Sequence, residues 1–394
     1  MNMGICIGNF DTSVLPADVL AAIGEDVPMY GVKFDPTGAT SAGVRTYDAA
    51  NLRFSPSTNT TVGIDDFANL APFKTRECCR VYSGGSTKYY YKENFSASDW
   101  QDIREGKHLS VVGDIMIEIP AFYYYRPSEG EFIVSAKFKP GFLPSPAHYR
   151  NGKMLDKIWV SKYNIDVNFE SKSKTNPRTS TNMNTFRSNL AQREMYMLDY
   201  PTWCSLVMLM LVKYGNMDVQ ATVANGRSFS SVLANGNADN VLGLDGSATA
   251  ITANEASLTL GIENFYGNVW KYLDGMFLYQ YYVYLADVTT ISSDPKQASD
   301  LSTYTKLSNP ISNSNMSTLF NFCFDKTIPY AMYGITGSDT FKTNDIQYTG
   351  AGLTLALYGG SYSNGSDCGL FGVYFNARVG YASADCGCCG CCFS

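Results

Sequence analysis

Histidine and formal charge are scarce in this chain of 394 residues. It contains two histidines, His108 and His148, and only 17% of its residues are charged, with a formal net charge of −6. The histidines lie among unrelated residues, and the sequence has no P-loop, no HExxH zinc motif and no Ser-His-Asp order. A negative net charge also disfavours a nucleic-acid backbone as partner. We therefore expect neither a common type of catalytic site nor a nucleic-acid-binding surface.

Long hydrophobic runs are lacking as well. The most apolar segment, Trp203–Val212, has about half the length that a membrane span needs. The first residues contain no basic segment followed by an apolar run, so we expect no signal peptide and no transmembrane segment. The eleven cysteines are an odd number in a chain without an export signal, which predicts mostly free thiols.

The C-terminal stretch Tyr348–Ser394 has no Lys, Glu, Gln, Met or Trp, and it holds ten glycines and six of the eleven cysteines. Small and aromatic residues alternate along it, and Gly359-Gly360 and Asn364-Gly365 are turn signals, which predicts short strands and tight turns. Tyr, Ser, Asn, Asp and Gly crowd between the apolar positions, and binding loops use these residue types for contact area and adaptable hydrogen bonds. We interpret the stretch as a binding surface; a buried C-terminal sheet is the alternative.

The motif GGSYSNGSDCGLFGVYFNARVGYASADCG, residues 359–387, resembles the variable region of proteins diversified by diversity-generating retroelements. MLDYPTWCSLVMLMLVKYGNMDVQA (197–221) and GIENFYGNVWKYLDGM (261–276) extend the resemblance, which covers essentially the whole chain. It implies an α+β C-type-lectin fold of the formylglycine-generating-enzyme type, with a variable region at about 357–394. In that family randomised adenines turn an Asn codon into codons for Tyr, Ser, Asp, Gly, Arg or Cys. Such changes cannot produce the five residue types that Tyr348–Ser394 lacks.

The resemblance also implies which side chains bind the ligand. The positions that match variable or polar sites of the family pattern are Tyr358, Ser361, Tyr362, Ser363, Asn364, Ser366, Asp367, Gly372, Tyr374, Asn376, Arg378, Gly380, Tyr381, Ser383 and Asp385. We expect Tyr358, Tyr374 and Tyr381 to be the anchors, because interface hot spots are rich in Tyr. The apolar positions expected to hold the backbone rigid are Leu357, Leu370, Phe371, Val373, Phe375, Ala377, Ala382 and Ala384. The alternative is that the tyrosines belong to the sheet core.

The rest of the chain is predicted to form two regions. Residues 1–150 are expected to be a small β-rich N-terminal attachment module, and residues 151–394 the C-type-lectin-like domain. YGVKFDPTGATSAGVRTYDAANL resembles the attachment module of phage tail proteins that carry this domain. The first region is predicted to contain a short helix between Asp11 and Gly24, a turn at Asp35–Gly38, and strands at Tyr30–Phe34, Lys88–Lys92, Ile115–Ile119, Ala121–Tyr125 and Glu131–Phe138.

The second region is predicted to begin with a strand near Ile158–Tyr163 and to contain two helices, at 184–194 and 201–214. The second helix has Pro201 in its first turn and Gly215 after its end, which are typical start and stop signals. Its nearly continuous hydrophobicity predicts a helix buried against a sheet. The resemblance places Gly-Asn-Val-Trp, residues 267–270, on a core strand.

An enzymatic alternative comes from the formylglycine-generating enzyme, a relative implied by the resemblance. Its active cysteine pair is replaced here by Asn364 and Gly369, with Cys368 adjacent, and one thiol cannot form a two-thiolate metal site. The run Cys386–Cys392 has the wrong spacing for structural zinc and is interpreted as small side chains packed in a terminal strand. We therefore expect no enzyme activity, no metal and no cofactor.

The function that follows is non-enzymatic binding of a ligand or receptor by a retroelement-diversified surface. The setting implied is a phage or prophage tail, where the chain is an adhesin for a host-cell surface protein or glycan. Other tail or surface structural proteins are expected to attach to the N-terminal module, and a homotrimer is expected by analogy. A bacterial surface or secreted ligand-binding protein of the same fold is the alternative.

Overall fold

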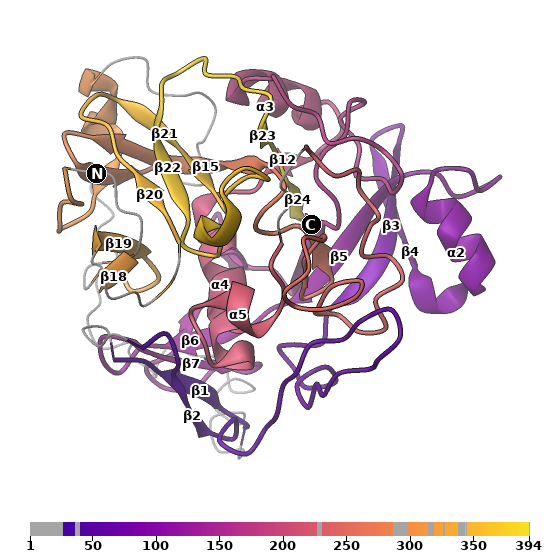
Figure 1. Cartoon of the computed structure of the whole chain (residues 1–394), viewed down its shortest axis with the longest axis horizontal. Coiled ribbons are helices and arrows are strands. Elements are labelled where there is room, and N and C mark those ends of the chain that lie inside the picture. Colours follow the sequence, from indigo (N-terminus) through magenta and orange to yellow (C-terminus); the bar gives the residue numbers. More distant parts are fainter. Residues whose placement is uncertain are drawn as a thin grey trace.

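The computed structural model describes residues 27–35, 40–226, 231–286, 298–313, 319–325, 328–337, 343 and 345–393. The helix expected between Asp11 and Gly24 lies outside these residues, as does the turn expected at Asp35–Gly38 apart from Asp35. The architecture of the described residues is α+β and mostly β, with several sheets and few helices (Figure 1).

Helix α4 (Tyr200–Tyr214) lies at the centre of the molecule (Figure 1). The side chain of Asp199 caps its first turn by accepting a hydrogen bond from the N–H of Thr202, and Pro201 occupies the first turn. Gly215 ends it with a φ of 64°, a left-handed conformation that glycine adopts without strain. All fifteen residues of the helix are buried, so the predicted core helix is confirmed. No helix among the described residues is long and apolar enough to span a membrane.

A five-stranded sheet from the first part of the chain packs against one side of α4. Its strand order is β2-β1-β7-β6-β8, and all its pairs are antiparallel. The strands are β1 (Tyr30–Lys33), β2 (Val44–Tyr47), β6 (Tyr123–Tyr125), β7 (Glu131–Ser135) and β8 (Leu143–Pro144). The strands expected near residues 30, 121 and 131 are therefore present, with somewhat different ends.

A six-stranded sheet contains strands from both predicted regions, residues 1–150 and residues 151–394. Its order is β12-β24-β11-β5-β3-β4, so a strand before residue 150 pairs with one after it: Ile158 of β11 stands opposite Ile119 of β5. The boundary predicted at residues 150 and 151 is therefore wrong, because these strands share one sheet. The strands are β3 (Arg76–Ser83), β4 (Ser86–Tyr91), β5 (Asp114–Pro120), β11 (Lys157–Ser161), β12 (Tyr196–Met197) and β24 (Gly390–Phe393).

A seven-stranded sheet carries the C-terminal stretch. Its order is β17-β16-β15-β21-β22-β20, and β23 pairs in parallel with the start of β15. Of the Gly-Asn-Val-Trp motif only Trp270 lies on a strand; Gly267 and Asn268 have φ of 75° and 64° and turn the chain into it. The strands are β15 (Trp270–Tyr279), β16 (Tyr282–Leu285), β17 (Thr305–Lys306), β20 (Gln347–Tyr348), β21 (Thr354–Tyr358), β22 (Val373–Ala377) and β23 (Cys386–Gly387).

The remaining elements are short. Helix α3 (Met183–Ala191) confirms the first helix predicted for the second region, and its N-cap is Asn182. The prediction missed α2 (Ala97–Arg104), although Ser96 and Asp99 form an N-terminal capping pattern. The others are α5 (Val219–Thr222), the 3-10 turns η2 (Lys92–Asn94), η3 (Ala298–Thr303) and η4 (Gly365–Asp367), and the strand pairs β9 (Tyr149–Arg150) with β10 (Lys153–Met154), β13 (Leu258–Thr259) with β14 (Ile262–Glu263), and β18 (Leu319–Phe324) with β19 (Met332–Gly337).

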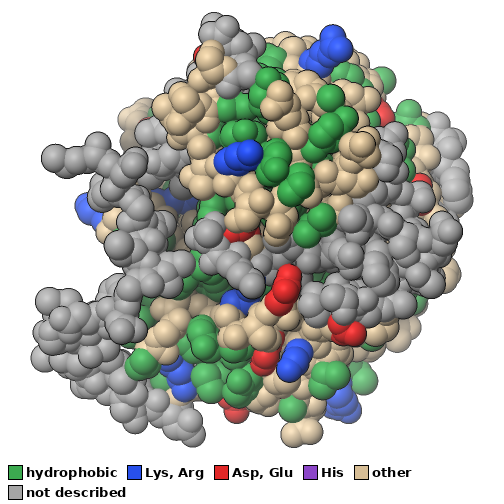
Figure 2. Space-filling view, turned by 90° about the vertical axis from the view of Figure 1, so that its left-hand side faces the viewer, with side chains coloured by type: hydrophobic (Ala, Val, Ile, Leu, Met, Phe, Trp, Pro, Cys, Tyr) green, Lys and Arg blue, Asp and Glu red, His purple; other side chains and the backbone are tan. Residues whose placement is uncertain are grey.

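Several charged side chains in the interior are paired with opposite charges. Lys213 at the end of α4 is buried, and its Nζ lies 2.7 Å from Asp65 Oδ2 and 2.6 Å from Asp245 Oδ2. Burial alone would lower the pKa of Lys213, but the two carboxylates raise it overall. On the surface shown in Figure 2, the Lys, Arg, Asp and Glu side chains of the described residues are scattered and form no broad basic patch.

Candidate binding site

Strand β22 separates apolar from polar side chains. Val373, Phe375 and Ala377 are buried, whereas Tyr374 between them is half-buried and Asn376 is exposed. Successive side chains of a strand point to opposite faces of its sheet, so one face of β22 joins the core and the other faces outward. The alternation predicted from the sequence is confirmed for this strand.

Two glycines turn the chain from β21 into the loop that precedes β22. Gly359 and Gly360 have φ of 92° and 79°, which confirms the predicted turn. A Cβ on Gly360 would lie 2.5 Å from Cys368 Sγ, so the loop closes tightly on itself. After this turn, Asn364 Oδ1 accepts hydrogen bonds from both the N–H and the Oγ of Ser361, each at 2.9 Å. These contacts fix the backbone from which Ser363 and Asn364 project.

A buried carboxylate fixes the other end of the same loop. Asp345 Oδ2 accepts a hydrogen bond of 2.7 Å from the N–H of Phe371. A Cβ on Gly369 would lie 2.0 Å from Asp345 Oδ1, so glycine is required by this close approach. Burial raises the pKa of Asp345 well above its usual range. The loop is thus tied to the core at both ends.

A cavity of about 260 Å³ opens beside this loop and β22. Its lining residues come from β15, β20, β22, β23, the loop and the segment before β23: Trp270, Tyr348, Ser363, Asn364, Tyr374, Tyr381, Asp385 and Cys386. Strand pairing brings several of these lining residues together. Tyr348 stands opposite Tyr374 in the parallel pair of β20 and β22. Trp270 pairs with Cys386 in the same way between β15 and β23.

Aromatic rings form most of the cavity's framework. The ring centroids of Trp270 and Tyr374 are 5.7 Å apart, those of Tyr348 and Tyr374 5.3 Å, and those of Tyr374 and Tyr381 6.0 Å. The hydroxyl of Tyr272 donates a hydrogen bond of 2.6 Å to the carbonyl of Tyr381, which holds that residue's backbone in place. Tyr374 contacts the other three rings and is the centre of the cluster.

The electrostatic character of the cavity is acidic. Of the described residues that line it, Asp385 alone carries a charge, and its Oδ1 accepts hydrogen bonds from Ser383 Oγ and from Cys386 Sγ. Burial raises the pKa of Tyr374, and Tyr381, Cys386 and Asp385 raise it further. Burial likewise raises the pKa of Tyr348, with a second contribution from Asp367. Both shifts favour the neutral phenol.

The structure brings five of the predicted site residues together in the cavity: Ser363, Asn364, Tyr374, Tyr381 and Asp385. Others are exposed or half-buried outside its lining: Tyr362, Ser366, Asp367, Asn376, Arg378, Gly380 and Ser383. Together these residues belong to one continuous stretch of chain.

Three predicted site residues are buried instead, and the prediction that they contact a ligand is wrong for this structure. Tyr358 is 0% exposed and packs against the rings of Trp203 and Phe265. The reason is that β21 lies between β15 and β22 and is covered on both faces, so alternation gives it no exposed side. Ser361 and Gly372 are buried in the loop closure.

Two of the predicted core positions show the opposite error. Ala382 and Ala384 are exposed, because the segment between Tyr381 and β23 is a loop and not a strand. The other core positions expected in the variable region are buried as predicted: Leu357, Leu370, Phe371, Val373, Phe375 and Ala377.

Trp270, Tyr348 and Cys386 line the cavity but were not among the predicted site residues. Trp270 belongs to the Gly-Asn-Val-Trp motif, which the sequence assigned to the core; it is only 4% exposed and closes the cavity from the inside. Behind it, the buried Lys271 donates hydrogen bonds of 2.7 Å to the carbonyls of Gly267 and Val269. These bonds hold the turn that delivers Trp270 to the cavity.

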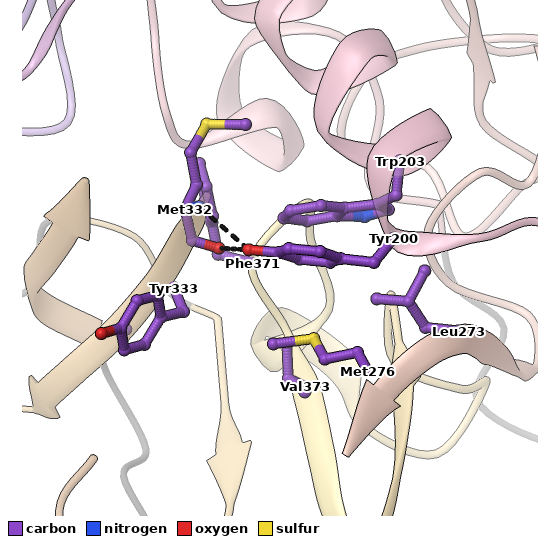
Figure 3. A pocket seen from close by; sticks show the side chains of 9 residues that line it. Tyr200, Trp203, Leu273, Met276, Met332, Tyr333, Phe371 and Val373 are labelled. Atoms are coloured by element: carbon purple, nitrogen blue, oxygen red, sulfur yellow. Dashed lines mark hydrogen bonds between the residues drawn. The ribbon is translucent and has the colours of Figure 1, made fainter. Parts of the chain in front are cut away.

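A second cavity lies in the core between α4, β15 and β19 and is shown in Figure 3. Its volume is about 10 Å³, which is at the lower limit for one water molecule. The hydroxyl of Tyr200 crosses this region to donate to the carbonyl of Met332 at 2.9 Å and to accept from the N–H of Met332 at 3.0 Å (Figure 3). This cavity is a packing gap and not a ligand site.

The cysteines give no sign of a reactive or metal-binding centre among the described residues. Cys386, Cys388, Cys389, Cys391 and Cys392 are buried free thiols, and burial raises the pKa of Cys392 to about 12. Cys368 Sγ donates a hydrogen bond of 3.2 Å to the carbonyl of Ser361, and so has a structural role in the loop. No group of three or more His, Cys, Asp or Glu side chains within the described part of the chain is arranged to hold a metal ion.

Comparison with known proteins gives structural neighbours only. No protein-family model and no curated protein matches the chain. Among solved structures it is similar to the U1 variant of Major Tropism Determinant, with a TM-score of 0.32 and 12% identity over 96% of this chain and 88% of that chain. The M1 variant has a TM-score of 0.31 and 13% identity over 81% of this chain and 71% of that chain. A TM-score near 0.3 is too low to transfer a fold or a function, so the geometry of the cavity carries the functional conclusion.

Proposed function

We propose that the chain is a non-enzymatic receptor-binding protein whose variable region, at about 357–394, presents a diversified binding surface. The observation that carries the proposal is the cavity. Five positions predicted to vary line it, and they are interleaved with buried residues that belong to the core. A surface whose backbone is fixed loses little conformational entropy on binding, so changes of side chain translate into affinity.

The proposal also covers the domain that carries the cavity, the part of the chain that attaches to other proteins, and the oligomeric state. The sequence motifs support a lectin-like domain of the formylglycine-generating-enzyme type for the part that carries the cavity. Attachment to other tail proteins is assigned to the sheet β2-β1-β7-β6-β8, since all its strands come from residues 30–144. The setting proposed is a phage or prophage tail. A homotrimer is proposed as well, and light scattering would then give three times the chain mass of 43.3 kDa.

Flow cytometry on intact bacteria tests receptor binding. The purified chain is labelled with a fluorophore and incubated with a panel of strains, and we expect binding to a subset of them. The double variant Tyr374→Ala/Tyr381→Ala is expected to lose that binding, because truncation of hot-spot tyrosines costs about 2 kcal/mol or more each. Tyr149→Ala, at an exposed tyrosine on β9, is the matched control and is expected to bind like the natural chain.

Thermal denaturation of the same variants separates binding from folding. The double variant is expected to unfold within a few degrees of the natural chain, because both tyrosines are only partly buried. Unchanged cell binding by the double variant would contradict the proposal, and so would binding to no strain of the panel. Unfolding of the double variant would assign the tyrosines to the core instead.

Sequencing of the gene tests diversification separately. The codons of the variable positions are expected to derive from adenine-rich codons, with an invariant template copy and a reverse transcriptase gene nearby. Absence of a template copy would remove the diversification part of the proposal and leave the binding site in place.

A further inference from the structure

We infer that the cavity recognises a cationic group, namely the side chain of a Lys or Arg residue on a protein receptor. This inference rests on the proposed function and specifies its ligand. It follows from three features of the cavity: inclined aromatic rings, a held carboxylate, and surrounding polar residues suited to protein contact.

The rings of Trp270, Tyr348 and Tyr374 line the cavity at steep angles to one another. The planes of Trp270 and Tyr348 are inclined by 74°, those of Trp270 and Tyr374 by 46°, and those of Tyr348 and Tyr374 by 60°. Such mutually inclined rings resemble the aromatic cages that bind ammonium and guanidinium groups through cation–π attraction. A single flat platform, which suits the apolar face of a sugar ring, would instead need parallel or isolated rings.

The charge distribution adds a second reason. Asp385 is the single charged residue of the described lining, and Ser383 holds its carboxylate in place through a hydrogen bond. The carbonyl of Asp367 accepts a hydrogen bond of 3.0 Å from the N–H of Ile346, two residues before Tyr348, so a second acidic residue stands near the same wall. A cation entering the cavity would meet negative charge and aromatic faces at once, and an anion would meet repulsion.

The polar residues around the cavity favour a protein as the source of the cation. Ser363 and Asn364 line the cavity, and the exposed side chains of Ser366 and Asn376 lie on the same stretch of chain. These residue types make adaptable hydrogen bonds to polypeptide surfaces. The net charge of −6 further favours a basic patch as the complementary surface.

Isothermal titration of the full chain with small probes tests the inference. The probes are Nα-acetyl-lysine methylamide, Nα-acetyl-arginine methylamide and the neutral Nα-acetyl-norleucine methylamide. We expect the two cationic probes to bind with Kd of about 1–10 mM at low ionic strength and the neutral probe to bind at least about tenfold more weakly. Added salt is expected to weaken the cationic probes alone, because the attraction is partly Coulombic.

Two variants locate the binding. Asp385→Asn keeps the shape and an acceptor oxygen for Ser383 but removes the charge, and is expected to weaken the cationic probes about fivefold or more. Asp102→Asn, at an exposed carboxylate on α2, removes a charge on another part of the molecule and is expected to change nothing (Figure 1). Thermal denaturation of both variants confirms that they are folded.

Three outcomes would overturn the inference: equal binding of the neutral probe, no effect of Asp385→Asn, or no cationic binding up to about 10 mM. Binding of methyl glycosides in place of the cations would assign the cavity to a glycan receptor. If the tyrosine double variant abolishes cell binding while the lysine and arginine probes fail, only the cation is wrong. If the cationic probes bind but the chain binds to no bacterial strain, the inference that the cavity takes a cation holds and the receptor-binding proposal fails.

Discussion

The two faces of strand β22 differ in what surrounds them. On the inner face Val373 and Phe375 are buried in the same core as α4, and on the outer face Tyr374 lines an open cavity while Asn376 is exposed. Truncation of a large side chain on the inner face leaves a void in a close-packed interior, whereas a substitution at an exposed outer position such as Asn376 changes mainly what a ligand meets. A strand of this kind can keep its backbone fixed through its buried side chains while its exposed side chains vary.

Phe375→Ala gives the largest effect expected on the inner face. The side chain is 0% exposed and lies in the main core cluster, so its truncation is expected to lower the free energy of unfolding by about 3–5 kcal/mol. Thermal or denaturant unfolding of the purified variant measures this loss. A drop below about 1 kcal/mol would show that the inner face is not part of a close-packed core.

Acid is expected to weaken the core through His148. Burial lowers its pKa from the ordinary value of 6.5 to about 4, and the guanidinium of Arg150 adds to this effect. Its Nε2 lies 3.2 Å from the carbonyl of Ile119, which can only accept a hydrogen bond, so the neutral ring carries its proton there. Between pH 6.5 and 4 the unfolded chain binds a proton that the folded chain does not. The free energy of unfolding is therefore expected to fall as the pH falls through this window, by roughly 3 kcal/mol in total.

The measurement compares the unfolding of the natural chain and of His148→Gln at pH 7.5 and pH 4.5. The comparison needs the variant because Glu263, whose pKa burial and Asp239 raise to about 7, titrates with the opposite sign. The folded chain keeps the proton of Glu263 longer than the unfolded chain, so its contribution to stability falls as the pH rises. We expect the natural chain to lose its advantage over His148→Gln at the lower pH. An unchanged difference between the two proteins would show that His148 does not titrate as described.

Gly360→Ala probes the join between the two faces. Gly360 has a φ of 79°, where an alanine is strained, and the new Cβ would lie 2.5 Å from Cys368 Sγ. We expect a loss of about 1–3 kcal/mol in unfolding free energy, together with weaker ligand binding because the loop shapes the cavity. Gly352→Ala, where nothing lies within 4 Å of the added Cβ, is the matched control. If Gly360→Ala binds and unfolds like the control, the turn does not determine the cavity.

Local signals in the sequence predicted the local structure well. Helix α4 was predictable because Pro201, Gly215 and a long apolar run all indicate the same boundaries, and β22 because its apolar residues alternate. The turn at Gly359 and Gly360 was predictable because two successive glycines permit positive φ. The C-terminal motif also indicated five of the residues that line the cavity.

Long-range pairing was not predictable from the same signals. The sequence does not show that β11 pairs with both β5 and β24, so the predicted domain boundary failed. Tyr358 was assigned to the surface because its residue type fits the variable pattern, whereas the position of β21 between two strands buries it. Trp270 and Tyr348 join the cavity only through strand pairs between distant segments, and no local pattern marks them.

The smallest effect on stability is expected from the outer face itself, and it is the sharpest test of the comparison. Asn376 and Arg378 are exposed and lie on either side of the buried Ala377. The double variant Asn376→Ser/Arg378→Ser is expected to change the unfolding free energy by less than about 0.5 kcal/mol per site, because exposed side chains without special contacts contribute little. Its binding to the panel of bacterial strains is expected to change in pattern, since both positions are exposed and belong to the stretch of chain that also supplies the cavity. Thermal unfolding and flow cytometry on the same preparation measure both quantities.

Two results would contradict this prediction. A loss of stability close to that of Phe375→Ala would show that the outer face also supports the core. A binding pattern identical to that of the natural chain would show that β22 presents no part of the binding surface beyond Tyr374.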